Sequence, residues 1–166
     1  EWGQLRGAAI ARDANGNAII NPGGTYAVEQ NHFFGSVLPD FTGGILNTFA
    51  YKNFNLAASI DFQKGGKFFS LTEQWGISSG LLEETAGTND RGNPKRDAPA
   101  NGGGIHVTGV DASGNAVDQY VDAHTYSAQW YSNRLAEPFI HDASYIKLRE
   151  LSLSYNLPDR IIGGFL

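Results

Sequence analysis

ILNTFAYKNFNLAASIDFQ, residues 45–63, alternates apolar side chains with small or polar ones on both sides of Lys52-Asn53. A period of two is typical of β-strands with two unlike faces. Because Lys52-Asn53 leaves room for a two-residue turn, the two halves are predicted to form a hairpin. Its register pairs Tyr51 with Phe54, Phe49 with Leu56, Asn47 with Ala58 and Ile45 with Ile60. This register places both apolar sets on one face.

The alternation does not decide what the apolar face contacts. A soluble sandwich would bury it against a second sheet, whereas a membrane barrel would expose it to lipid. In a barrel, Tyr51 and Phe54 would form one interfacial aromatic girdle, with Phe62 near the other. The opposite face is small and polar and suits a water-filled lumen; it carries Thr48, Ala50, Ala57, Ser59 and Asp61.

A third strand is predicted over residues 144–157, before Pro158, which cannot donate to a ladder. Its apolar residues change parity at Arg149-Glu150, which indicates a bulge or the point where the strand leaves the membrane. Lys147 and Arg149 are candidates for the lumen-facing side, where they would line a route for polar cargo. Pairing with neighbouring acidic residues is an equal alternative.

The connections differ greatly in length: two residues at 52–53, against 80 residues at 64–143. Outer-membrane barrels have short periplasmic turns and long extracellular loops. The predicted fold class is therefore all-β, a fragment of a large transmembrane antiparallel β-barrel with long extracellular loops. We expect an extracellular loop and hairpin region at 1–44, a transmembrane hairpin at 45–63, a long extracellular loop at 64–143, a transmembrane strand at 144–158, and a periplasmic turn with the start of another strand at 159–166.

The composition agrees with a β protein that has large loops. The chain has 21 Gly, 12 % aromatic residues and 17 % charged residues, whereas soluble domains are typically about 25 % charged. A net charge of −5 argues against nucleic-acid binding, and the absence of Cys excludes disulfides and Cys-ligated zinc. No apolar run reaches the roughly 18 residues that a membrane helix needs. The lack of Met and a start in mid-pattern predict a piece of a longer chain.

The long loop is expected to have some local structure. Residues 71–84 have helical character, 106–121 suggest a short hairpin around 111–115, and 125–134 suggest a short helix, while 89–104 read as irregular. Residues 7–20 suggest another hairpin around 13–17.

Three segments resemble motifs of SusC/RagA-type TonB-linked outer-membrane transporters. They are GSVLPDFTGG (35–44) followed by NTFAYKNF (47–54), FQKGG (62–66), and DASYIKLRELSLSYNLP (142–158). The resemblance implies part of a plugged barrel of roughly 22 strands in the bacterial outer membrane. It further implies import of oligosaccharides or peptides, energy delivered through TonB, and a SusD-like surface lipoprotein as a lid. The family's plug, TonB box and final strands have no counterpart here, so a C-terminal portion of the barrel is expected.

Four aromatic residues of the long loop are the candidates for contact with a ligand or with the lid: Trp75, Tyr126, Trp130 and Tyr131. Exposed aromatic rings offer large contact areas to sugars or partner proteins. The alternative is that these side chains form a small core of the loop itself.

Catalysis and metal binding are not predicted, and no cofactor is expected. The four His residues lack metal-ligand spacing, Glu83-Glu84 has no predicted pocket, and Asp142-Ala143-Ser144 lacks a nucleophile elbow. Asp13 and Asp111 begin Gly-containing loops that fit ordinary turns better than calcium sites. An importer is thus the leading hypothesis, a soluble secreted β-sandwich that binds carbohydrate is second, and an enzyme is third.

Overall fold

The computed structural model describes residues 2–158 and 163 and divides the chain into two compact units. The sheet unit comprises Ser36–Lys67 and Asp142–Leu166, and the lobe comprises Glu1–Gly35 and Phe68–His141. Residues 159–166, expected as a turn and a new strand, lie outside the described residues except for residue 163. Each unit is built from segments that are distant in sequence.

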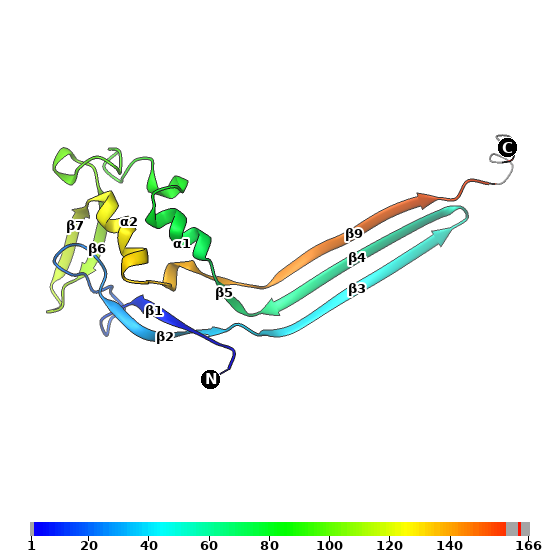
Figure 1. Ribbon diagram of the computed structural model, residues 1–166, viewed down its shortest axis with the longest axis horizontal. Helices are drawn as coiled ribbons and strands as arrows, with labels where there is room; N and C mark the ends of the chain where they lie inside the picture. The colour runs from blue at the N-terminus through cyan, green and yellow to red at the C-terminus, as the bar shows by residue number, and fades with distance from the viewer. Residues whose placement is uncertain (1, 159–162, 164–166) are drawn as a thin grey trace. The chain divides into compact units, whose positions relative to one another are not determined.

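The sheet unit is a three-stranded antiparallel sheet in the order β3-β4-β9 (Figure 1). Its strands are β3 (Pro39–Tyr51), β4 (Phe54–Gly65) and β9 (Tyr145–Tyr155). All four predicted cross-strand pairs between β3 and β4 are present. Lys52 has a φ of 52°, as the first central residue of a tight hairpin turn requires. The predicted hairpin and its register are confirmed.

The hairpin begins earlier than the sequence pattern predicted. Pairing continues from Ile45 back to Pro39, opposite Gly65, with a register shift between Pro39 and Phe41. Gly43-Gly44 hides this extension because glycines contribute no side chains to an alternating pattern. Residues 39–44, expected in an outer loop region, therefore belong to the strand.

The change of parity at Arg149-Glu150 is a β-bulge. Leu148 is opposite Ile60 and Glu150 is opposite Ser59, so Arg149 is the extra residue in β9. One extra residue reverses the alternation within its own strand. As a result, the apolar side chains before and after the bulge lie on the same face of the sheet.

The lobe is a small α/β unit in which residues 2–35 fold together with most of the segment predicted as a long loop. Three two-stranded sheets involve its residues: β1 (Gln4–Ile10) with β2 (Val28–Ser36), β5 (Lys67–Phe69) with β8 (Ile140–Asp142), and β6 (Ile105–Val110) with β7 (Ala116–Val121). The helices are α1 (Leu71–Ser78) and α2 (Ala123–Ser132), with short 3₁₀ turns η1 (Glu83–Thr85), η2 (Pro99–Asn101) and η3 (Glu137–Phe139).

These elements confirm the predicted 106–121 hairpin and the two short helices, and they correct the hairpin expected over 7–20. A turn does form at Asp13, whose side chain accepts hydrogen bonds from the backbone N–H of Asn15 and Asn17. Beyond the turn, the pairing consists of the bridge between Arg12 and Ala18 and a hydrogen bond from the Ile19 N–H to the Ala11 carbonyl. The strand before it pairs with β2 instead, a longer-range partner that local turn signals cannot indicate.

The core of the lobe is small and forms around α2. One buried cluster contains Ile20, Val107 and Val121, and a second contains Trp130, Leu135 and Phe139. Tyr26 and Tyr126 pack against both clusters.

Two buried glutamines connect the helices and loops around this core. Gln129 Nε2 donates to the carbonyl of Tyr126, and its Oε1 accepts from the N–H of Tyr26. Gln74 Nε2 donates to the carbonyls of Trp130 and Leu135, at 2.9 and 3.0 Å. Carbonyls at the end of a helix have no partner within the helix, so Gln74 of α1 satisfies acceptors at the end of α2.

The loop around Asp90 is attached to the β6–β7 hairpin through His106. The imidazole Nδ1 is 2.7 Å from a carboxylate oxygen of Asp90, and Nε2 is 2.9 Å from one of Asp118. The ring stacks on Tyr120, whose hydroxyl donates to Asp90, and the Arg91 guanidinium lies 3.5 Å from the Tyr120 ring centroid. The hydrogen bond and charge of Asp118 and Asp90 raise the pKa of His106. The hydroxyl of Tyr120, together with His106, lowers the pKa of Asp90.

We predict that Gln74→Met lowers the free energy of unfolding of the lobe by roughly 1–3 kcal/mol, because buried carbonyls lose their donor. Urea unfolding followed by tryptophan fluorescence measures this, since Trp2, Trp75 and Trp130 all belong to the lobe. Gln30→Met, at an exposed position of β2, is the control. Equal stability of the two variants would contradict the assignment.

We predict that attachment of the Asp90 loop depends on pH. The raised pKa of His106 makes its contribution complete below the ordinary His value of about 6.5 and lost as the pH rises through the folded-state value. The lowered pKa of Asp90 makes its contribution present above about 3.8 and lost as the pH falls through its folded-state value. Hydrogen exchange of residues 86–104, corrected for intrinsic rates, should be slower at pH 5.5 than at pH 8.5. His106→Gln should remove the difference and His124→Gln should keep it; a difference that survives in His106→Gln refutes the prediction.

Candidate functional site

One face of the sheet unit is apolar apart from Asn47, which lies opposite Ala58. Cross-strand partners share a face, so the register collects alternate residues of all three strands on this side. They are Ile45, Phe49, Tyr51, Phe54, Leu56, Ala58, Ile60, Phe62, Ile146, Leu148, Leu151, Leu153 and Tyr155. Ile146 is 83 % exposed and Leu153 is 70 % exposed. An apolar surface of this extent on a water-soluble protein normally marks a place where something else binds.

The opposite face is small and polar, apart from Leu46. Its residues are Thr48, Ala50, Asn55, Ala57, Ser59, Asp61, Lys147, Glu150, Ser152 and Ser154. Lys147 is the cross-strand partner of Asp61. The guanidinium Nε of Arg149 forms an ion pair with the Asp61 carboxylate, so the bulge residue also directs its charge to this face. Both predicted lumen-facing cations therefore lie on the polar side, and Arg149 has the acidic partner that was the alternative.

Aromatic residues gather at the two ends of the apolar face. At the turn end, Phe54 and Tyr155 have ring centroids 4.6 Å apart, beside Tyr51. At the other end, the Phe62 and Phe41 centroids are 6.2 Å apart. Tyr155 and Phe41 were not among the predicted girdle residues. Extending the hairpin register to the third strand would have placed Tyr155 opposite Phe54.

The motif segments meet at the Phe62 end of the sheet. The backbone N–H of Gly65 donates to the Ser144 hydroxyl, and Gln63 Nε2 donates to the carbonyl of Ala143. Gly65 has a φ of 77°, and a Cβ there would lie 2.6 Å from Asp40 Oδ2. The glycine of the FQKGG segment is thus required by its backbone conformation and by close contact with the PDF segment.

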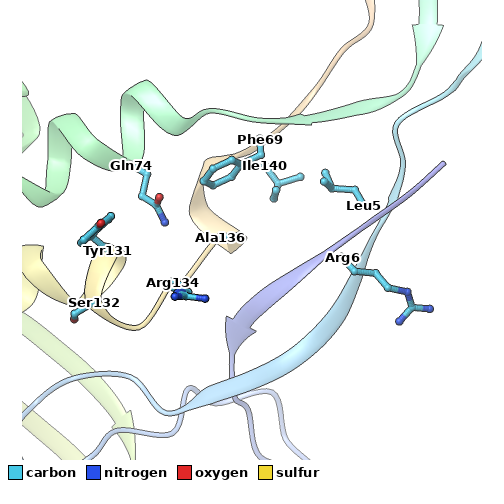
Figure 2. Close-up of a pocket in the computed structure, with 9 residues that line it drawn as sticks. All are labelled: Leu5, Arg6, Phe69, Gln74, Tyr131, Ser132, Arg134, Ala136 and Ile140. Carbon is cyan, nitrogen blue, oxygen red and sulfur yellow. The ribbon is translucent and has the colours of Figure 1, made fainter. Parts of the chain in front are cut away.

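The lobe contains a cavity of about 550 Å³ between β1, β5, β8 and the two helices. Figure 2 shows the nine residues that line it: Leu5, Arg6, Phe69, Gln74, Tyr131, Ser132, Arg134, Ala136 and Ile140. Tyr131 also contacts Trp75 edge to face, with the ring centroids 5.1 Å apart. Both rings are more than half exposed.

The four aromatic candidates of the long loop therefore separate into two pairs. Trp75 and Tyr131 form the exposed pair beside the cavity. Trp130 is only 5 % exposed and Tyr126 packs against it, with centroids 5.4 Å apart. Burial raises the pKa of Tyr126 far above its usual range. Positions 126 and 130 are one helical turn apart, and both side chains pack in the small core of the lobe, which is the alternative given for them from the sequence.

Sequence reasoning missed Arg134, which lines the cavity and follows the end of α2. Its φ is 54°, a conformation in which glycine is the usual residue after a helix. An arginine at a position that normally favours glycine was the available signal.

The other sequence candidates show turn geometry. The Asp111 carboxylate accepts hydrogen bonds from the backbone N–H of Ser113 and Asn115, as Asp13 does in its own loop. The side-chain amides of Asn17 and Asn115 also donate to Asp13 and Asp111, and these bonds, together with the backbone ones, lower the pKa of both aspartates. Among residues 2–158 and 163, no group of three or more His, Asp or Glu side chains is placed to hold a metal ion.

The helices that the structure describes are too short or too polar to cross a membrane.

No family model matches this chain. It is similar to two curated proteins of Formosa agariphila (strain DSM 15362 / KCTC 12365 / LMG 23005 / KMM 3901 / M-2Alg 35-1). TonB-dependent receptor P3 is 26 % identical over 157 residues, which are 95 % of this chain and 13 % of the relative. TonB-dependent receptor P26 is 26 % identical over 159 residues, which are 93 % of this chain and 13 % of the relative.

The chain spans about 13 % of the length of these relatives. Both alignments include the sheet unit and the lobe, because each covers more than nine-tenths of the chain. The similarity does not distinguish a SusC/RagA type among such receptors. It supports the identification of this chain as a segment of a TonB-dependent receptor.

Proposed function

We propose that this chain contributes three adjacent membrane strands and a folded loop domain to a SusC/RagA-type transporter of the bacterial outer membrane. The observation that carries the proposal is the two-faced sheet, with apolar side chains along one side and small or polar ones along the other. Lipid would contact the apolar face, and the polar face would line the interior of the barrel. The function is uptake, with no reaction catalysed by these residues.

The dimensions of the sheet support a membrane location. The segment from Phe54 to Phe62 contains nine residues of β4. A tilted membrane strand needs about 9–11 residues. Tyr51, Phe54 and Tyr155 would form the girdle at the turn end, and Phe62 and Phe41 would form part of the other. Lys147 and the Asp61–Arg149 pair would line the lumen.

Connection lengths support the orientation of the strands. Two residues join β3 to β4, whereas the lobe intervenes between β4 and β9. By the usual asymmetry of outer-membrane barrels, the turn at Lys52-Asn53 is periplasmic and the lobe is extracellular.

The motif resemblance supports the choice of partners and cargo. In this proposal a SusD-like surface lipoprotein covers the transporter, and TonB acts on a part of the protein outside this chain. The cargo is an oligosaccharide or a peptide. The exposed Trp75–Tyr131 pair on the lobe is the candidate contact for the cargo or for the lid.

Adjacent alanines in the middle of β4 provide the test. Ala58 lies on the apolar face and Ala57 on the polar face. In the complete gene product that carries this chain, Ala58→Arg should destabilise the assembled barrel by about 2–4 kcal/mol and reduce its amount in the outer membrane, because Arg then faces lipid. Ala57→Arg should assemble almost normally.

Heat-modifiable mobility on gels and outer-membrane fractionation measure assembly of the two variants. The proposal fails if both variants assemble equally well, or if the unmodified protein fractionates with water-soluble proteins. Water solubility would favour a secreted β-sandwich.

A further inference from the structure

The lobe cavity has an uncompensated positive charge. Its described lining includes Arg6 and Arg134 but no acidic side chain, although the whole chain has a net charge of −5. Arg6 donates to Gln4 and to the carbonyl of Asn31, and it points away from the other lining residues (Figure 2). Among the described residues, the guanidinium of Arg134 has no hydrogen bond or ion pair. Arg134 is therefore the cation available to a ligand.

Arg134 has a backbone conformation that is sterically costly for a residue with a side chain. The preceding residue, Asn133, caps α2 through its N–H, and Arg134 then takes a φ of 54°. Glycine takes this conformation without the steric cost that a side chain brings. Strained residues are concentrated at functional sites. An arginine in this conformation at the wall of a cavity points to recognition of an anion.

The neighbouring groups suit a sugar. Trp75 and Tyr131 present two exposed rings at an interplanar angle of 66°, so one ring can stack on the apolar face of a pyranose while the other bounds its edge. The Ser132 hydroxyl also lines the cavity. Gln74 uses its Nε2 protons on two backbone carbonyls, and no described residue donates a hydrogen bond to its Oε1. Aromatic surface with a few polar groups is the usual composition of a ligand site.

We propose that this cavity binds an oligosaccharide that carries a carboxylate or sulfate group, a specialisation that rests on the proposed uptake function. The Arg134 guanidinium pairs with the anionic group, because its planar donors match two oxygens of a carboxylate or sulfate. The Trp75–Tyr131 pair stacks on the sugar ring. Ser132 and Gln74 interact with its hydroxyl groups.

Calorimetric titration of the complete gene product in detergent tests the site with three probes. These are tetragalacturonate, a sulfated carrageenan tetrasaccharide and neutral cellotetraose. At least one anionic probe should bind ten-fold or more tightly than cellotetraose, and its affinity should fall as salt is added. Comparison of the two anionic probes identifies whether the recognised group is a carboxylate or a sulfate.

The Arg134→Gly variant distinguishes loss of anion binding at the cavity from loss of the folded structure. Glycine relieves the backbone conformation, so the thermal midpoint should stay the same or rise, while affinity for the anionic probe falls ten-fold or more. Trp75→Ala should weaken binding without abolishing the salt dependence. Arg91→Gln, which removes another exposed arginine of the lobe, should leave affinity unchanged.

Equal affinity for neutral and anionic probes, no binding of any probe, or unchanged affinity in Arg134→Gly would overturn the proposal. Assembly of the Ala57 and Ala58 variants does not depend on Arg134. If the protein assembles normally but shows no preference for anionic probes, only the proposal for the cavity is rejected. If the protein binds anionic probes but is not found in the outer membrane, the transporter proposal is rejected and the cavity site stands.

Discussion

Backbone pairing around β4 is the constraint on which the rest of the sheet unit depends. β4 has a partner on each edge, so its register with β3 and β9 decides which side chains share a face. The side-chain period of a strand is two, and a slip of one residue would exchange the apolar and polar faces. In lipid, where water cannot satisfy backbone groups, this pairing would also be the condition for crossing the membrane. In the described part of the chain, β3 and β9 each have one edge without a partner strand, which a barrel would supply from its neighbouring strands.

The bulge at Arg149 shows how the sheet keeps two unlike faces when the sequence changes phase. Without the extra residue, the apolar residues on one side of it would lie on the polar face. With it, Leu148 and Leu151 lie on one side and Glu150 on the other. The ion pair with Asp61 directs the extra side chain to the polar face. The bulge thus preserves the apolar surface and adds a cation to the polar face that also carries Lys147.

Elements of the fold could be predicted from the sequence where the contacts that form them join residues close together in the chain. The β3–β4 hairpin was predictable in full register because its turn and its alternation lie within one short segment. The Arg149 bulge was visible as a change of parity. The start of β3 was not, because Gly43-Gly44 carries no alternation. In the lobe, the pairing of β1 with β2 depends on residues that are distant in sequence.

The candidate site was only partly predictable for the same reason. Four aromatic residues looked equivalent in sequence, but burial is decided by how α1 and α2 pack, and this packing turns Trp130 inward and leaves Trp75 and Tyr131 outward. Arg134 was overlooked because its importance comes from backbone conformation and a cavity, neither of which a residue type alone reveals. The sequence did predict the end of a helix near residue 134. Glycine is favoured just after a helix, so an arginine at this position was a signal that could have been used.

The lobe has few apolar residues in its core, which bears on how its surface can evolve. Its two clusters are small, and buried amides of Gln74 and Gln129 connect helices and loops that apolar packing alone would leave weakly held. The exposed ring pair and Arg134 can therefore vary without loss of the lobe's fold, since the core does not include them. Such separation between a fixed framework and a variable binding surface is what loops that carry function generally require. In the proposed transporter, this separation would let the lobe change its ligand while keeping its fold.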